Sequence, residues 1–303
     1  MSTPIRYLSE DDVRAVLRWE TLIPAMARAL ASFSAGEVQQ PLRTILTIEE
    51  NRRFLGVMPA VARDAMGLKL VTFYPANEGT AVPTHMAMVL LFRPDTGEPL
   101  AVMDGRLITE MRTAAVSAAV TDIVAAPEAR VLALLGSGVQ ALAHLEALRH
   151  VRELTEVRVW SRNPEHARRF AAAHGAVATD AESAVRGADV IVTATSAMEP
   201  VLRGAWLKAG AHVNSVGANR PTWRELDDDA MAHTLVVDSR EAALAESGDV
   251  ILSKAAIYAE AGELFAGTKP RPSGATTIFK SMGLAIEDVA TARLVYDALA
   301  AAG

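Results

Sequence analysis

The chain contains no cysteine among its 303 residues. Disulfide bonds and thiolate metal sites are therefore excluded, and no other residue pattern points to a metal. Charge of one sign is never concentrated: the formal net charge is −6, and acidic and basic residues are mixed along the chain. Since no basic stretch could follow a phosphate backbone, we expect no nucleic acid partner.

Long apolar runs are missing as well. No segment approaches the length needed to cross a bilayer, and the opening MSTPIRYLSEDD lacks the apolar core of a secretory signal. We therefore expect a cytoplasmic protein with no membrane partner. Half of the residues are apolar and 22% are charged, which is typical of a globular chain with room for two domains or one large one.

The first part of the chain predicts a small α+β domain over residues 1–115. Ser9 followed by Asp12 resembles a capping box that opens a helix, and a second helix runs over residues 22–33 with Gly36 at its end. Short β-rich runs between about residues 43 and 104 are separated by turn residues, which predicts an antiparallel sheet. A long alanine-rich helix is expected to begin at Thr109 and to connect this domain to the next.

Beyond Pro127 the pattern alternates between strands and helices. The apolar runs ARVLALL, VRVWS, DVIVTAT, AHVNSV and TLVVD are separated by helical segments. Such alternation predicts a parallel, doubly wound sheet, and we expect a Rossmann domain over residues 116–279. The stretch after Val250 is expected to be mostly irregular, and the closing helix in residues 280–303 to rejoin the first domain.

A glycine-rich loop follows the first strand of this series and opens a helix. Its sequence is Gly136-Ser137-Gly138-Val139-Gln140-Ala141, a GxGxxA pattern. The first glycine permits a tight turn, the second lets the backbone approach a pyrophosphate, and the helix N-terminus favours the anion. In this strand–loop–helix context the pattern predicts a dinucleotide site.

The end of the second strand bears on the choice of dinucleotide. An NAD site normally has Asp or Glu here, which accepts hydrogen bonds from the ribose hydroxyls. This chain has Trp160-Ser161-Arg162-Asn163 instead. Arg162 can pair with a 2′-phosphate and Ser161 can donate a hydrogen bond to it. The residues thus favour NADP(H) over NAD(H), although Arg162 could also be an ordinary exposed arginine.

Three basic residues are candidates for the substrate site. Arg112 is expected in the first turn of the alanine-rich helix, where a cation is unfavourable unless an anion lies nearby. A substrate carboxylate or the pyrophosphate would supply that anion; otherwise Arg112 points to solvent or pairs with Glu110. Lys69 lies among apolar neighbours on a predicted strand, so it either extends to solvent or serves as a desolvated donor or acid–base group. Arg43 has no distinctive local signal. His85 directly precedes a predicted strand, and an isolated histidine at such a place is more often structural than catalytic.

Several segments together resemble the ornithine cyclodeaminase/µ-crystallin family. They are QPLRT, GLKLVTFYPAN, PTH, TGEPLAVMDGRLITEMRTAAVSAA, LLGSGVQA, VGANRPTWRELDD, SGDV and TTIFKSMGLAIED, and VGANRPTWRELDDDAM and FKSMGLAIEDVATARLVYDAL look closest to the µ-crystallin (ketimine reductase) branch. The resemblance implies a homodimer with the antiparallel sheet at its interface. It also implies that Arg43, Lys69 and Arg112 surround a substrate carboxylate beside the nicotinamide. Cofactor contacts are expected from Thr84, His85, Arg112, Thr113, Gly136, Gly138, Val139, Gln140, Ser161, Arg162, Asn163, Thr193, Ala194, Thr195, Val216 and Ser281.

One position departs from the pattern of cyclodeaminases and related alanine dehydrogenases. Those enzymes have an aspartate in a GxD motif for proton transfer, whereas this chain has Gly217-Ala218-Asn219. Amine oxidation needs a group that accepts a proton, and asparagine cannot do so. Reduction of a protonated imine needs only hydride, so Asn219 favours imine reduction. Asp227 could substitute, but its spacing gives no reason to expect it.

The leading hypothesis is therefore an NADPH-dependent reductase of small cyclic imino acids, such as pyrroline- or piperideine-2-carboxylate. A cyclodeaminase or an amino-acid dehydrogenase is the alternative enzyme. A non-catalytic, NADP-dependent binder of small ligands is the alternative of another class, and fold alone does not decide among the three.

Overall fold

The computed structural model describes residues 5–50 and 52–302. The chain divides into two units, residues 1–112 with 284–303 and residues 113–283. The sequence predicted the boundaries between the units at residues 115 and 280. In the structure, the chain passes from the first unit to the second inside helix α3 (Arg106–Val124). It returns to the first unit just before helix α11 (Ala285–Ala302).

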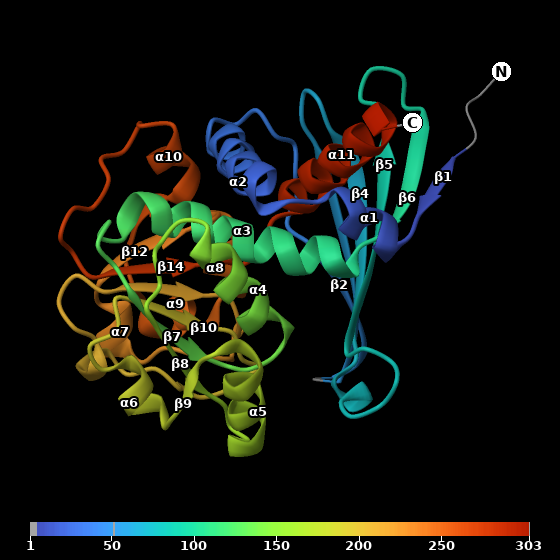
Figure 1. Ribbon diagram of the computed structural model, residues 1–303. Coiled ribbons are helices and arrows are strands. Elements are labelled where there is room, and N and C mark those ends of the chain that lie inside the picture. Colours follow the sequence, from blue (N-terminus) through green and yellow to red (C-terminus); the bar gives the residue numbers. More distant parts are fainter. Residues whose placement is uncertain (1–4, 51, 303) are drawn as a thin grey trace. The chain divides into compact units, whose positions relative to one another are not determined.

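The first unit is built on a six-stranded sheet with the order β1-β6-β5-β4-β3-β2 (Figure 1). Strands β2 to β6 form antiparallel pairs, as the turn pattern predicted, and β1 adds a parallel edge beside β6. β1 was not predicted, because three residues are too few to show an alternation. The strands are β1 (Arg6–Leu8), β2 (Thr44–Glu49), β3 (Arg53–Val61), β4 (Met66–Phe73), β5 (His85–Phe92) and β6 (Pro99–Asp104).

Helices cover one face of this sheet. α11 packs against β3, β4 and β5, and α2 (Trp19–Ser34) lies along α11 (Figure 1). The predicted capping box is confirmed at α1 (Glu10–Val16), where Ser9 Oγ accepts from the Asp12 amide at 3.3 Å. A short 3-10 helix, η1 (Pro75–Asn77), interrupts the connection between β4 and β5.

The opposite face of the sheet carries apolar side chains that are open to solvent. Leu46, Leu55, Thr72 and Met86 are directly opposite one another on β2 to β5, so they share one row on this face. Leu46 and Met86 are 53% and 39% exposed, and Met88 in the next row is 46% exposed. An accessible apolar sheet face of this kind is typical of an interface.

The second unit contains an eight-stranded sheet with the order β13-β12-β14-β11-β10-β7-β8-β9, and every pair is parallel. The strand order reverses at β7, which lies between β10 and β8, as in a Rossmann fold. The strands are β7 (Val131–Leu135), β8 (Glu156–Trp160), β9 (Val177–Ala178), β10 (Val190–Thr193), β11 (His212–Ser215), β12 (Thr234–Val237), β13 (Ile257–Glu260) and β14 (Thr277–Lys280).

Two of these strands lie where the sequence predicted irregular structure, and that prediction is wrong. β14 is fully buried between β11 and β12, and β13 forms an edge. Each has four residues after a loop-rich segment, so the local pattern was too short to identify them. The helices of this unit, with the shared α3, are α4 (Val139–Arg149), α5 (Pro164–His174), α6 (Ala181–Val185), η2 (Gly204–Trp206), α7 (Asp228–Met231), α8 (Arg240–Glu246), α9 (Gly248–Ser253) and α10 (Ala261–Phe265).

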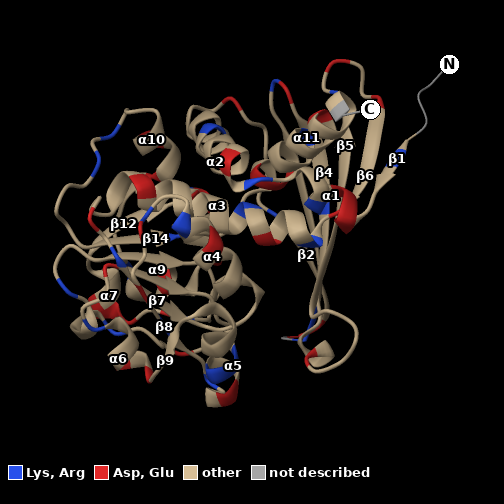
Figure 2. Cartoon of the chain, in the orientation of Figure 1, with Lys and Arg blue, Asp and Glu red and all other residues tan. Residues whose placement is uncertain are grey.

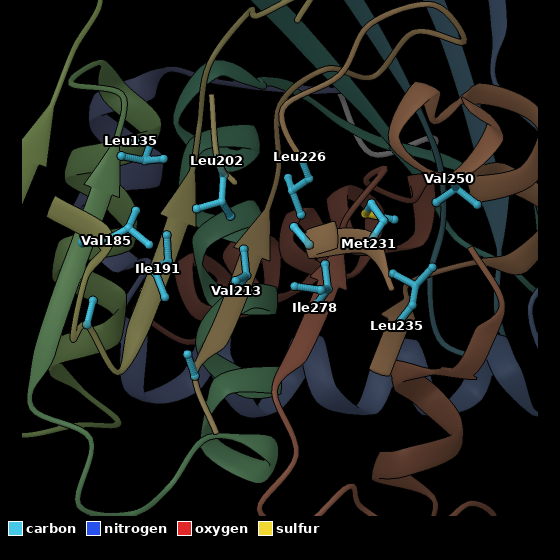
Figure 3. Close-up of a cluster of buried hydrophobic side chains, with 14 of the residues drawn as sticks. Leu135, Val185, Ile191, Leu202, Val213, Leu226, Met231, Leu235, Val250 and Ile278 are labelled. Carbon is cyan, nitrogen blue, oxygen red and sulfur yellow. The ribbon is translucent and has the colours of Figure 1, made fainter. Parts of the chain in front are cut away.

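Apolar side chains on one face of the central strands form the core of the second unit. Ile191, Val213, Ile278 and Leu235 are aligned across β10, β11, β14 and β12, and each is inaccessible to solvent (Figure 3). Side chains from the connecting segments close over this row, among them Val185, Leu202, Leu226, Met231 and Val250. This packing fixes the strands whose carboxyl ends carry the loops described below.

Positive and negative side chains are interspersed over both units (Figure 2). Across residues 5–50 and 52–302, no helix combines the length and the hydropathy needed to span a bilayer.

Candidate active site

The glycine-rich loop leaves β7 in a conformation that suits glycine. Gly136 has a φ of +122°, and a Cβ atom there would lie 2.5 Å from the carbonyl oxygen of Ala194. Gly138 is the N-cap of α4, makes no side-chain cap hydrogen bond, and has open space where a Cβ would be. The first amides of α4 are thus accessible to an anion. Val139 is 59% exposed beside them.

A buried carboxylate ties the neighbouring loops together. Glu225 accepts hydrogen bonds from the Thr195 amide at 2.7 Å, the Thr193 hydroxyl at 2.8 Å and the Gly217 amide at 2.9 Å. It thereby joins the loop after β10 to the loop after β11. The sequence analysis did not identify Glu225, because a single glutamate in RELDD gives no sign of burial.

The buried ion pair between Asp249 and Lys280 supports the segment that carries Glu225. Asp249 accepts from the amides of Glu225 and Leu226, at 2.8 and 2.9 Å, and lies 3.0 Å from the Lys280 ammonium. Burial raises the pKa of Glu225, with Asp249 adding to the effect, while Lys280 opposes it. All three charged groups are inaccessible to solvent, so they hold the loops and do not face the medium.

The loop after β8 carries the residues that suggested NADP(H). Arg162 is exposed, and Asn163 caps α5 by accepting from the Glu165 amide at 3.0 Å. A pocket of about 400 Å³ adjoins this region, where Ser137 of the glycine-rich loop faces His166, Arg169, Phe170, Ala173 and His174 of α5. The side of α5 that faces the loop is therefore basic and open.

The structure places most of the expected cofactor residues at one edge of the parallel sheet. They follow the carboxyl ends of five strands, which in a parallel sheet lie together: Gly136, Gly138, Val139 and Gln140 after β7, Ser161, Arg162 and Asn163 after β8, Thr193, Ala194 and Thr195 at or after β10, Val216 after β11, and Ser281 after β14. Thr113 lies in the same unit on α3, whereas Thr84, His85 and Arg112 belong to the first unit.

In the first unit, two cations converge on the first turn of α11. Lys69 extends from the helix-covered face of β4, and its ammonium lies 2.6 Å from Asp288 Oδ2. Arg112 donates from Nε to Asp288 Oδ1 at 3.0 Å and from Nη1 to Glu287 Oε2 at 2.5 Å. Lys69 and Arg112 are 2% and 5% exposed, and both carboxylates are inaccessible to solvent. We call these four residues the α11 charge cluster.

Burial sets the protonation of the α11 charge cluster. Desolvation lowers the pKa of Lys69 to about 8, assisted by the positive charges of Arg112 and Arg43 and opposed by Asp288. Burial by itself would raise the pKa of Asp288, but Arg112 and Lys69 outweigh it and lower that pKa. Asp288 is therefore ionised at neutral pH, whereas the lowered pKa of Lys69 lies within about one unit of neutral pH.

Arg43 and His85 lie near this cluster. Arg43 precedes β2, and its charge acts on Lys69. His85 begins β5 opposite Phe73, whose ring it meets edge-on at 6.1 Å between centroids. Desolvation and the charges of Lys69 and Arg112 lower the pKa of His85 to about 4, even though the residue is exposed at the surface of the chain. The structure thus brings Arg43, Lys69 and Arg112 together.

One sequence expectation about Arg112 is wrong. α3 begins at Arg106 and not at Thr109, so Arg112 lies in the second turn, away from the positive end of the helix dipole. Its side chain is buried and meets Glu287 and Asp288, so it does not point to solvent. These carboxylates, in the segment AIEDVA, were missed because their proximity to Arg112 exists only in the folded chain.

The model of the ornithine cyclodeaminase/mu-crystallin family matches residues 6–303. The chain belongs to this family. Ketimine reductase mu-crystallin of Mus musculus is 52% identical over 301 residues, and the alignment covers 96% of each chain. The resemblance noted from the sequence motifs is thereby confirmed.

Two solved structures of similar proteins cover the chain almost completely. Thermococcus litoralis Delta(1)-pyrroline-2-carboxylate reductase, in complex with NADH and L-proline, has a TM-score of 0.94 at 36% identity over 99% of this chain and 98% of its own. An archaeal alanine dehydrogenase dimer with bound NAD has a TM-score of 0.92 at 33% identity over 98% and 97%. The predicted α/β fold, with a Rossmann sheet and a second sheet rich in antiparallel strands, is confirmed in this member of the ornithine cyclodeaminase/mu-crystallin family.

Proposed function

We propose that this protein reduces small cyclic imino acids, of the pyrroline- and piperideine-2-carboxylate class, with a nicotinamide cofactor. The observation that carries the proposal is the α11 charge cluster, in which a lysine that titrates near neutral pH lies beside a buried arginine. The named activities of its relatives, a ketimine reductase and a Delta(1)-pyrroline-2-carboxylate reductase, support the same class of reaction.

The residues of the second unit fit a dinucleotide. Accessible amides at the start of α4 and the missing side chain at Gly138 suit a pyrophosphate. When bound, the nicotinamide supplies the hydride. We further propose that NADP(H) is preferred over NAD(H), because Arg162 and Ser161 replace the acidic residue that would repel a 2′-phosphate.

In the first unit, we assign the substrate carboxylate to Arg112 and Arg43. The ion pairs of Arg112 engage Nε and Nη1, which leaves Nη2 to donate to a substrate. We assign the Lys69 ammonium as the hydrogen-bond donor to the imine nitrogen, where negative charge would develop as hydride adds to carbon. The buried position of Lys69 strengthens this interaction, because little water screens it.

A substrate panel tests the proposal. Cyclic imines, keto acids with amines, and free amino acids are each supplied with NADPH or NADH, or with the oxidised cofactors, and nicotinamide absorbance is followed. We expect consumption of NADPH with cyclic imines. Ammonia release from ornithine would instead indicate a cyclodeaminase. Tight ligand binding without turnover of any imine would indicate a non-catalytic binder.

The cofactor preference has its own test. Arg162→Ala should weaken binding of NADPH by about tenfold or more and leave NADH nearly unchanged, because only the 2′-phosphate loses a charged partner. Equal affinity of the unmodified protein for NADPH and NADH would refute the preference. Since the reaction draws on reduced NADP, we also propose a cytoplasmic location.

We further propose a homodimer formed through the open face of the first unit's sheet. Leu46, Met86 and Met88 give this face accessible apolar area, and one solved relative is a dimer. A second copy of the same chain would cover the face with the same apolar residues, as a two-fold interface requires.

A further inference from the structure

Asp288 joins elements that are far apart in the sequence. Its two carboxylate oxygens meet Lys69 of β4 at 2.6 Å and Arg112 of α3 at 3.0 Å, and Asp288 itself lies in the first turn of α11. Buried ion pairs of this kind stabilise a fold little better than apolar side chains of similar volume would. Stability is therefore a weak reason for two buried cations and two buried anions at this place.

We propose that Asp288 is a positioning residue for imine reduction: it fixes the Lys69 ammonium beside Arg112 and keeps it charged for delivery of a proton to the imine nitrogen. This inference rests on the proposed function. For a neutral imine, a bound reduced nicotinamide would supply the hydride that forms the new C–H bond as the π bond of C=N opens toward nitrogen. The Lys69 ammonium would give its proton to that nitrogen, and solvent would then reprotonate the neutral Lys69.

The charges around Lys69 explain why a carboxylate is needed. Arg43 before β2 and Arg112 on α3 both disfavour a proton on Lys69, and so does burial. His85 on β5 and Glu287 on α11 are further ionisable groups nearby, and β3 contributes the neutral Met58 opposite Lys69. Glu287 engages Arg112, whereas Asp288 is in direct contact with Lys69.

The scarcity of lysine makes the charge state of Lys69 directly measurable. The chain has five lysines: Lys69, Lys208, Lys254, Lys269 and Lys280. In protein labelled with ¹³C at lysine Cε, NMR should resolve five signals, and Lys69→Met identifies one of them. We expect that signal to titrate near pH 8, far below an exposed lysine.

Asp288→Asn is the decisive variant. It keeps the shape of the side chain but removes the negative charge, so the Lys69 titration should move at least one unit lower. The alkaline limb of kcat/KM for a cyclic imine should move with it, with a loss of about fivefold or more near pH 8 that approaches tenfold at higher pH and is recovered toward lower pH. Asp297→Asn is the matched control, because Asp297 lies on the same helix in an exposed pair with Arg293. It should move neither the NMR titration nor the limb.

A second variant covers the case in which Asp288→Asn does not fold. Asp288→Glu keeps the charge but displaces it, so Lys69 should stay charged at pH 7 while kcat falls more than KM rises. The inference is overturned if the Lys69 signal titrates at the same pH in Asp288→Asn, or if Asp288→Glu leaves kcat unchanged. If the unmodified protein reduces no imine, the proposed function fails, and the NMR titration still decides whether Asp288 keeps Lys69 charged.

Discussion

Asn219 is the residue that bears most directly on the direction of catalysis. It follows Ala218, which has a φ of +53°, on the loop after β11, and its side chain is exposed. An amide can donate and accept hydrogen bonds but cannot take up a proton at neutral pH. The position therefore offers polarity without general-base catalysis.

Replacement of Asn219 by Asp tests this argument. We expect Asn219→Asp to raise amino-acid oxidation or deamination by about tenfold or more, because a carboxylate can accept the ammonium proton. The rates are compared by nicotinamide absorbance in both directions, and vigorous ornithine cyclisation by the unmodified protein would contradict the argument.

Two buried histidines should make the second unit sensitive to acid. His144 contacts Ser117 Oγ at 2.9 Å and the Gln140 carbonyl at 2.7 Å, while His212 contacts Thr277 and Asn214. Desolvation lowers the pKa of each to about 4, from 6.5 in the unfolded chain. Between pH 6.5 and 4 the unfolded state binds more protons, so stability is lost as pH falls through that window.

By pH 5.5 the loss should be about 1 kcal/mol for each histidine. Urea unfolding at pH 7, 6 and 5.5 measures it, and His144→Gln should reduce the loss at pH 5.5 by about 1 kcal/mol. An unchanged pH slope in that variant would show that His144 is not the group responsible.

At the scale of elements, the loop from β7 to α4 contains one glycine that its backbone conformation requires and another that only a ligand contact would require. Gly136 needs glycine for its positive φ and for the close approach of Ala194, whereas Gly138 needs it only if something occupies the adjacent space. The two positions lie two residues apart, so they form a matched pair.

We expect Gly136→Ala to destabilise the protein by about 1–3 kcal/mol and to weaken cofactor binding. Gly138→Ala should leave the thermal midpoint nearly unchanged and still weaken NADPH binding, because its Cβ would meet the pyrophosphate. Thermal unfolding and a cofactor titration distinguish the two. Normal NADPH affinity in Gly138→Ala would mean that the pyrophosphate does not approach this glycine.

At the scale of the whole molecule, the proposed dimer would cover the open face of the six-stranded sheet. Charge placed in a covered apolar interface is costly, because it loses its hydration without gaining an ion pair. The double variant Leu46→Lys, Met88→Lys should therefore convert a dimer into a monomer at micromolar concentration. Light scattering after size-exclusion chromatography measures the mass.

Leu244→Lys provides the control for the dimer prediction, since Leu244 is 61% exposed on α8 of the other unit. It should leave the mass of the assembly unchanged. A monomeric unmodified protein, or a dimer that survives both lysines, would place the interface elsewhere or remove it.

Features that depend on short-range pattern could be predicted before the fold was known. The glycine-rich loop between a strand and a helix, the capping box at Ser9 and the alternating strands β7, β8, β10, β11 and β12 all follow from residues close together in the chain. Arg162 stands where an acid would select NAD, which led to the prediction of NADP(H), and family motifs pointed to Lys69 and Arg112.

The pairing of distant charges became visible only in the folded chain. Asp288 is 219 residues from Lys69 in the sequence, and Glu225 binds loops that follow two different strands. The start of α3 and the buried strand β14 also depended on packing, since neither has a strong local signal. Burial changes the energy of a charge more than any sequence neighbour does, so the partners of Lys69 and Arg112 emerge only when the chain is folded.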